Sequence, residues 1–235
     1  MQEVRHGCAG AMSGAAELLL SVEEQVRPAH AALVIVDLQN DFCAEDGFLS
    51  RARAEGGGPK IREEDNVRVA QNIDRLATAA RAARMPVVWL RSIYDFKYLA
   101  PAHIAKRGGK EGLCMEGSWG ADFFRIRPQP GDLVVDKHTF SGFHQTRLHE
   151  ALQAQGVKTL VFTGVATNVC VDSTLREGFF LGYYVVLAED CVSSSNGAGH
   201  EGTLATVRVN FGTVLRSEEL IALLGRDAEA GRPAA

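Results

Sequence analysis

Three side chains of different chemistry stand at or near the ends of apolar stretches in this sequence. Asp37 follows the apolar run 31–36, Lys137 follows the run 133–135 and Asp136, and Cys170 closes the segment TGVATNVC at 163–170. A carboxylate can accept a thiol proton, an ammonium can hold a thiolate and orient the base, and a thiol can attack a carbonyl carbon. The set predicts acyl transfer by a cysteine, although each residue alone is more often a solvated charge, a structural ion pair or a core thiol.

The segment around Cys170 indicates how its thiol would be activated. A strand is expected to end near Gly164 and a helix to begin within a few residues, which places Cys170 in the first turn of that helix. Unpaired N–H groups and the positive end of the helix dipole lower a thiol pKa there and form a pocket for an oxyanion. We therefore expect a stabilised thiolate at Cys170, with a buried structural thiol as the alternative.

The elements that must position these residues follow a repeating strand and helix pattern. Short runs rich in Val and Leu, without polar alternation, are typical of parallel strands covered by helices on both faces. The pattern predicts strands over 31–36, 87–90, 133–135, 159–163 and 184–187, and helices over 66–84, 146–155, 168–181 and around 203–209 and 217–224. We expect an α/β protein with a three-layer αβα fold and a mostly parallel central sheet.

Ligands of such sheets collect beyond the carboxyl ends of the strands. Asp37, Arg91, Lys137 and the turn 164–170 occupy these positions. Two glycine-bearing loops, 42–60 and 92–131, are longer than ordinary connections and are expected to line or cover a site. We expect one domain over 29–235, preceded by an N-terminal extension over 1–28 that lacks a strong period and is expected to be flexible.

Composition excludes several classes of protein. The 235 residues are 46% apolar and 23% charged, which are globular values, and the net charge of −4 comes without a basic stripe for nucleic acid. The longest fully apolar runs, among them 31–36, are too short to span a membrane. No disulfide framework is indicated, since the five cysteines are scattered without a CxxC pair. The stretch 15–20 contains Glu17 and lies among other glutamates, which fits a signal sequence poorly. We expect a cytoplasmic protein without nucleic-acid or membrane partners.

Three stretches carry a resemblance to a known family. LVIVDLQNDFC, VVDKHTFSGF and FTGVATNVCVDSTLREGFFLGYYVVLAEDC resemble the isochorismatase-like cysteine hydrolases, which hydrolyse amide and related C–N bonds in small molecules. The resemblance implies that Asp37 is the general base, Lys137 its partner and Cys170 the nucleophile. It also implies a cis peptide between Val165 and Ala166, which would aim the N–H groups of Ala166 and Cys170 at one carbonyl oxygen, and it implies a homodimer or homotetramer.

Within the family, the run from 164 to 181 most resembles ureidoacrylate amidohydrolases, with biuret hydrolases and N-carbamoylsarcosine amidases more distant. Cys170 argues against the vinyl-ether cleavage of true isochorismatases, which lack the nucleophilic cysteine. Nicotinamidase-type members carry metal-binding Asp and His residues after the second strand, where this chain reads RSIYDF and His103 stands alone. We expect neither a metal nor another cofactor.

The choice of substrate is expected to depend on the two long loops. Aromatic walls suit a planar ureido or amide group, and Arg91 could pair with a carboxylate or serve as a structural residue at the end of its strand. We expect a small planar ureido acid, while biuret-like, carbamoyl and simple carboxamide substrates stay open. The expected substrate-binding residues are Phe42, Arg91, Tyr94, Trp119, Phe140, Phe143 and His144.

Two hypotheses of another class compete with the enzyme. In the first, the chain is a non-catalytic binding protein of the same fold in which Cys170 is inert. In the second, Cys170 is a redox sensor, which requires a resolving cysteine such as Cys43 or Cys191 close to it.

Overall fold

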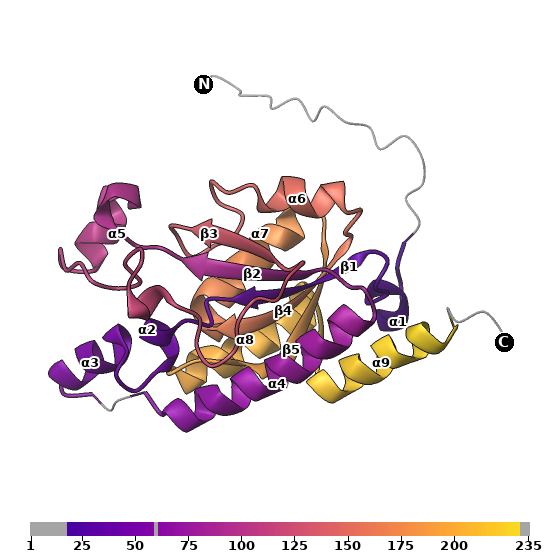
Figure 1. Cartoon of the computed structure of the whole chain (residues 1–235), viewed down its shortest axis with the longest axis horizontal. Coiled ribbons are helices and arrows are strands. Elements are labelled where there is room, and N and C mark those ends of the chain that lie inside the picture. Colours follow the sequence, from indigo (N-terminus) through magenta and orange to yellow (C-terminus); the bar gives the residue numbers. More distant parts are fainter. Residues whose placement is uncertain (1–17, 59–60, 231–235) are drawn as a thin grey trace, which may run out of the picture.

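A parallel β-sheet forms the centre of the computed structural model, which describes residues 18–58 and 61–230 (Figure 1). The described residues form six strands in the order β3-β2-β1-β4-β5-β6, and every neighbouring pair is parallel. This confirms the predicted α/β fold, with a wholly parallel sheet, and adds β6, which was not predicted. The strands are β1 Ala31–Val36, β2 Val87–Ser92, β3 Leu133–Lys137, β4 Thr159–Val165, β5 Tyr184–Ser193 and β6 Gly212–Leu215.

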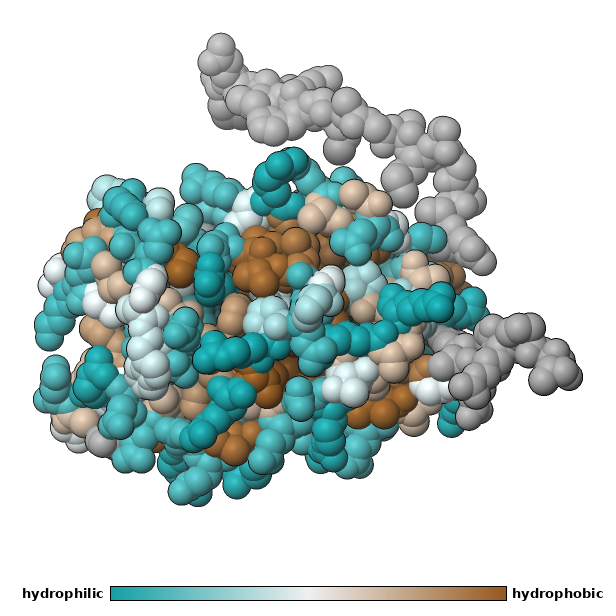
Figure 2. Space-filling model, in the orientation of Figure 1, coloured by the Kyte–Doolittle hydropathy of each residue, from teal (hydrophilic) through white to brown (hydrophobic). Residues whose placement is uncertain are grey.

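Helices cover both faces of this sheet. On one face α4 and α9 pack against strand residues such as Leu33 and Ile35, and on the other face α6, α7 and α8 pack against residues such as Val34 and Val36. In the orientation of Figure 1 the surface is mostly hydrophilic, with apolar side chains gathered in separate patches (Figure 2). The α-helices of the described residues are α1 Val22–Gln25, α2 Asn40–Cys43, α3 Phe48–Glu55, α4 Glu63–Ala82, α5 Pro101–Lys106, α6 Leu148–Ala154, α7 Asp172–Phe180, α8 Gly197–Asn210 and α9 Ser217–Ala230.

The two-sided cover explains the composition of the central strands. All six residues of β1 are buried, and successive side chains of a strand point to opposite faces, so both faces require apolar residues. Each fully buried Val, Leu or Ile side chain contributes about 1.5–3 kcal/mol to the stability of the fold. The strand is therefore an unbroken apolar run, and it ends where Asp37 must face the site.

The two long loops contain short helices and join each other. Loop 42–60 carries the end of α2 and all of α3, and loop 92–131 carries α5; α3 and α5 lie beyond the carboxyl ends of β1 and β2 (Figure 1). The buried carboxylate of Asp41 accepts the N–H of Phe48 at 2.8 Å and the N–H of Cys114 at 2.7 Å. One side chain thus ties both loops together, so that they cover the strand ends as a unit.

The N-terminal boundary differs from the expected one. Ser21 caps α1 together with Glu24 in a capping box, and Val26 is buried in the core on the α4 side of the sheet. Residues 18–28 therefore belong to the packed domain, while the rest of the expected extension, residues 1–17, lies outside the described residues. In the part of the chain that the structure describes, no helix is long and apolar enough to cross a membrane.

Candidate active site

Asp37 and Lys137 form a buried ion pair at the carboxyl edge of the sheet. Lys137 Nζ donates to Asp37 Oδ2 at 2.7 Å, and neither residue is exposed to solvent. The same ammonium donates to Ser92 Oγ and to the carbonyl oxygen of Thr139, both at 2.9 Å, so that its three N–H groups each have an acceptor. The pairing follows from topology, because β1, β2 and β3 are neighbours and end at one edge.

Ser92 and Gln39 hold this pair in place, and sequence reasoning missed both. The hydroxyl of Ser92 accepts from Lys137 and donates to Asp37 Oδ1 at 3.0 Å. Gln39 Oε1 in turn accepts the N–H of Ser92 at 2.7 Å, and its amide donates to the Ser92 carbonyl at 2.9 Å. The sequence indicated these two roles only by the presence of a polar residue two positions after Asp37 and of another at the end of β2.

The charge of Lys137 is maintained despite complete burial. Burial alone lowers the pKa of an ammonium, but the negative charge of Asp37, with contributions from Cys170 and Tyr94, outweighs burial and raises the pKa of Lys137 above its ordinary value. The residue is therefore an ammonium throughout the physiological range.

Cys170 lies in a π-helical turn, Thr167–Val171, that leads directly into α7. Its side chain is 5% exposed, and it lines the same cavity as Ala166. Burial and the charge and hydrogen bond of Asp37 raise the pKa of the Cys170 thiol to about 12, although Lys137 and Tyr94 act in the opposite direction. The expected helical turn is confirmed, but the raised pKa contradicts the expected thiolate at rest, because burial and Asp37 together outweigh Lys137 and Tyr94.

The turn between β4 and Cys170 contains two backbone features. The peptide bond between Val165 and Ala166 is cis, as the family resemblance implies. Gly164 has a φ of 105°, and a Cβ atom at this residue would lie 2.0 Å from the carbonyl oxygen of Val36. Only glycine fits there, because the ends of β1 and β4 approach each other closely and so bring Asp37 toward the turn of Cys170.

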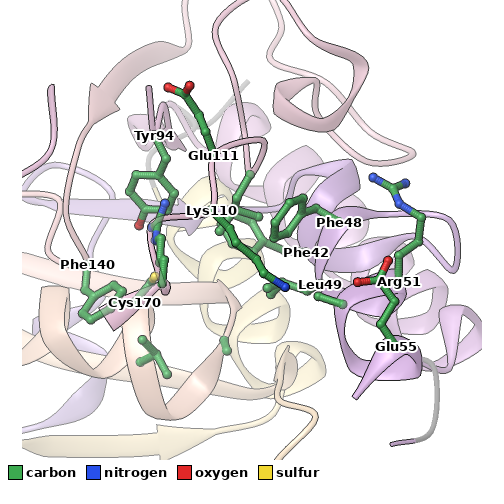
Figure 3. Close-up of a pocket in the computed structure, with 15 residues that line it drawn as sticks. Phe42, Phe48, Leu49, Arg51, Glu55, Tyr94, Lys110, Glu111, Phe140 and Cys170 are labelled. Atoms are coloured by element: carbon green, nitrogen blue, oxygen red, sulfur yellow. The ribbon is translucent and has the colours of Figure 1, made fainter. Parts of the chain in front are cut away.

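A cavity of about 620 Å³ opens above Cys170 (Figure 3). It lies between the sheet edge and the two joined loops. Among the expected site residues it is lined by Phe42, Tyr94, Phe140, Ala166 and Cys170. Three of the expected aromatic side chains and the thiol therefore line one cavity.

Four expected substrate-binding residues lie elsewhere. Arg91 binds Asp136 of the neighbouring strand with two hydrogen bonds of 2.6 and 2.8 Å, because β2 and β3 place the two residues in register. Trp119 lines a different cavity, Phe143 is buried and stacks on Tyr183, and the side chain of His144 is exposed. None of these four residues lines the cavity that contains Cys170, so their expected role in substrate binding has no support from the arrangement of the cavity.

Other residues of the two loops line the cavity and were missed. Their positions depend on α3 and on the segment after α5, which the sequence pattern indicated only as loops. They are Phe48, Leu49, Arg51, Ala52 and Glu55 from α3, and Arg107, Lys110, Glu111 and Leu113 from the segment after α5; Val169 from the turn of Cys170 completes the lining. Two features of the sequence could have indicated that these loop segments line a cavity: the apolar pair at 48–49 and the basic residues between 106 and 110.

Among the described residues, the histidines form no metal-binding group, and Cys43 and Cys191 lie apart from Cys170. His103 stacks on Phe140 with 5.3 Å between ring centroids, and no group of three or more metal-ligating side chains occurs within the described ranges. Cys43 and Cys191 belong to the apolar core on the α4 side of the sheet, whereas Cys170 belongs to the core on the α7 side. This separation removes the support for a redox pair between Cys170 and either of these cysteines.

The fold and the site together place a cysteine, a buried carboxylate and a buried ammonium at the carboxyl edge of a parallel sheet. Residues 31–219 match the isochorismatase domain family. Ureidoacrylate amidohydrolase RutB of Methylobacterium radiotolerans is 38% identical over 206 residues, covering 80% of this chain and 76% of that protein. The chain therefore belongs to the isochorismatase family, and its enzyme class is that of hydrolases acting on C–N bonds.

Solved structures of the family are similar as well. A cysteine hydrolase from Pseudomonas syringae superposes with a TM-score of 0.74 and 27% identity, covering 86% of this chain and 96% of that one. N-carbamoylsarcosine amidase from Thermoplasma acidophilum superposes with a TM-score of 0.66 and 26% identity, covering 80% of this chain and 97% of that one.

Proposed function

We propose that the chain is a cysteine-dependent amidohydrolase that cleaves a C–N bond of a small ureido acid through a thioester intermediate. One observation carries the proposal: the Cys170 thiol lines a cavity of about 620 Å³ while a hydrogen-bonded Asp37 and Lys137 pair lies at the same sheet edge. The thiol, its base and the cation that orients the base are thus assembled where a substrate can enter.

The first half of the proposed reaction forms the thioester. The thiol proton passes to Asp37 as Cys170 Sγ attacks the carbonyl carbon, so that no free thiolate has to exist at rest. The carbonyl oxygen becomes negative and accepts the N–H groups of Ala166 and Cys170. When the C=O bond re-forms, the C–N bond breaks, and ammonia or an amine leaves with the proton held by Asp37.

The second half releases the product. Asp37 takes a proton from water, whose oxygen attacks the thioester carbon, and the C–S bond breaks with return of the proton to the sulfur. Lys137 stays protonated through both halves and holds Asp37 in place through its hydrogen bond of 2.7 Å. Atoms balance, since one water is added across the C–N bond.

The proposed substrate is a ureidoacrylate-like ureido acid. Phe42, Tyr94 and Phe140 supply aromatic walls for a planar conjugated group. The similarity to a ureidoacrylate amidohydrolase points in the same direction. Biuret and other carboxamides are the alternative substrates, because the attacked carbonyl carbon is the same in each.

The test is release of ammonia from ureidoacrylate, biuret, N-carbamoyl amino acids, nicotinamide and aliphatic amides. We expect fastest turnover of ureidoacrylate, loss of activity in Cys170→Ala, and no effect of EDTA, since no metal takes part in the proposed steps. Parental turnover by Cys170→Ala would disprove the mechanism, and activity restored only by zinc or manganese would disprove its metal independence. Absence of turnover on every compound would favour the non-catalytic binding protein.

For assembly we propose a homodimer or homotetramer in the cytoplasm, where reduced thiols persist. Exposed apolar side chains at the ends of α7 and α8 support association, among them Phe180 and Val209, which are 73% and 81% exposed. Light scattering that shows a monomer at micromolar concentration would contradict this assembly.

A further inference from the structure

We propose that Arg107 selects anionic substrates by binding the carboxylate of the ureido acid, the role that the sequence pattern suggested for Arg91. The inference rests on the proposed function, which assigns the ureido group of the substrate to Cys170. It adds that the carboxylate at the other end of the substrate binds Arg107. It makes Arg107 a specificity-determining residue, with no part in the bond-breaking steps.

The position of Arg107 in the cavity is the first reason. The residue follows α5, is half-buried and lines the cavity that contains Cys170. Its guanidinium carbon lies 4.0 Å from the centroid of the Tyr94 ring, and Lys137 Nζ lies 5.8 Å from the same centroid. Because Arg107, Tyr94 and Cys170 line one cavity, a small molecule bound there can present one end to the thiol and the other end to Arg107.

The lack of an acidic partner is the second reason. Arg91 is bound by the carboxylate of Asp136, and the Arg51 guanidinium donates to the backbone carbonyl of Asp46. Within the described part of the chain no carboxylate pairs with Arg107, whose side-chain contact is the face of Tyr94. A half-buried cation that lines a cavity without an anion is prepared for an anionic ligand.

The two carboxylates of the cavity do not neutralise this arginine. Glu111 accepts the N–H of Phe96 at 3.0 Å and points away from Cys170 (Figure 3). Glu55 extends from the end of α3, on the opposite wall of the cavity from Tyr94 (Figure 3).

The chemistry of the guanidinium separates Arg107 from the neighbouring Lys110. A guanidinium is planar and can donate two parallel N–H bonds to one carboxylate, and stacking on an aromatic ring holds its plane while its N–H edges stay available. Lys110 is exposed, and its side chain extends toward Leu49 on the α3 side (Figure 3). We therefore assign the carboxylate to Arg107.

The experiment compares ureidoacrylate with its methyl ester, which has the same ureido group but no negative charge. Affinities are measured by calorimetry in a Cys170→Ala background, and turnover by ammonia release with Cys170 present. Arg107→Gln is the test variant, and Lys106→Gln is the matched control, since Lys106 is the preceding cation of the chain but does not line the cavity. Thermal unfolding of each variant verifies that it is folded.

We expect Arg107→Gln to weaken binding of the acid about 10- to 100-fold, the effect of losing a charge-assisted hydrogen bond, and to change binding of the ester by less than about twofold. The loss in turnover should appear in KM, because the contact is the same in the ground state and the transition state. Arg107→Lys should restore part of the preference for the acid, and Lys106→Gln should change neither affinity.

Three results would overturn the assignment. The parent protein could bind the acid no more tightly than the ester, or Arg107→Gln could weaken binding of the acid and the ester equally. Alternatively, Lys110→Gln, and not Arg107→Gln, could remove the preference for the acid. A different result would identify failure of the proposed function. If binding of the acid depends on Arg107 but no ureido compound is hydrolysed with Cys170 present, the result supports the anion site and contradicts the proposed hydrolysis of ureido acids.

Discussion

The protonation of Cys170 shows how burial competes with a helix terminus at the scale of a single residue. A helix dipole stabilises a nearby anion by about 0.3–1 kcal/mol, which is less than one pKa unit. Burial beside the negative charge of Asp37 acts in the opposite direction and raises the thiol pKa to about 12. At neutral pH the nucleophile rests as a thiol, and the proposed attack therefore requires Asp37 to take the proton.

This requirement makes the activity of Asp37→Asn dependent on pH. We expect kcat/KM at neutral pH to fall about 10²- to 10⁴-fold, the usual contribution of a general base. The residual activity should rise about tenfold per pH unit, because hydroxide must supply the thiolate. The rise should level off below pH 12, since removal of the Asp37 charge leaves Lys137 to lower the thiol pKa.

The measurement is kcat/KM from about pH 6 to 9.5 for the parent, Asp37→Asn and Asp136→Asn. The last variant removes a carboxylate that pairs with Arg91 at the same edge of the sheet and should change activity by less than about threefold. A residual activity of Asp37→Asn that does not change with pH would contradict the role of Asp37 as the base.

Accessibility distinguishes Cys170 from the other thiols. Cys43, Cys114 and Cys191 have no exposed surface, whereas Cys170 lines the cavity. We expect iodoacetamide to modify Cys170 in the folded protein, faster as the pH rises toward its raised pKa, and the other three only after unfolding. Peptide mapping by mass spectrometry checks this in a Cys8→Ser background, and an unmodified Cys170 would favour the inert thiol.

At the scale of elements, the site depends on the close approach of two strand ends. Gly164 combines a φ of 105° with a distance of 2.0 Å between its hypothetical Cβ and the Val36 carbonyl oxygen. Asp37 follows Val36 directly and has a φ of 49°, so β1 turns sharply at the same place. The geometry that aims Asp37 at the site is thus set by two adjacent strand ends and not by a loop.

We expect Gly164→Ala to reduce the free energy of unfolding by about 2–4 kcal/mol, because the backbone of β1 cannot move away without disturbing the sheet. Gly202→Ala is the matched control, since Gly202 lies within α8 with no atom within 4 Å of a hypothetical Cβ. That variant should gain up to about 1 kcal/mol from helix propensity. Urea unfolding measures both, and equal stabilities would contradict the close approach.

At the scale of the whole molecule, buried thiols couple stability to alkaline pH. The folded pKa values of Cys43, Cys114, Cys170 and Cys191 are all raised above the ordinary value of 9.0, with burial as the largest cause. Above pH 9 these thiols lose protons in the unfolded chain but keep them in the folded protein. The unfolded state then binds fewer protons, so the free energy of unfolding falls as the pH rises.

Between about pH 7 and 8.5, we expect these thiols to change the free energy of unfolding little. Above about pH 9, each thiol should lower the free energy of unfolding by up to about 1.4 kcal/mol per pH unit. Lys137 acts in the same direction above its ordinary value of 10.5, because its folded pKa is also raised. Urea titrations at a series of pH values measure the slope, and Cys191→Ala should reduce it by one thiol. A stability that stays constant well above the ordinary thiol pKa would contradict burial of the thiols.

The amino-acid sequence was sufficient to predict the order of the main strands and the residues that follow them. Unbroken apolar runs require cover on both faces, which implies a parallel sheet whose strands end at one edge. Asp37 and Lys137 are therefore predicted to lie at that edge from their positions in the chain, with Cys170 in a turn beside them. The cis peptide before Ala166 followed from the family resemblance, since no local pattern encodes it.

The cations that face the cavity could not be predicted in this way, because their positions depend on the packing of the loops. Arg91 pairs with Asp136 because β2 and β3 share a register, and Arg107 lines the cavity because Asp41 ties the two loops together. Both outcomes depend on contacts between residues far apart in the chain, which periodicity does not encode. The raised pKa of Cys170 has the same origin, because burial is a property of the packed molecule and outweighs the local effect of a helix terminus.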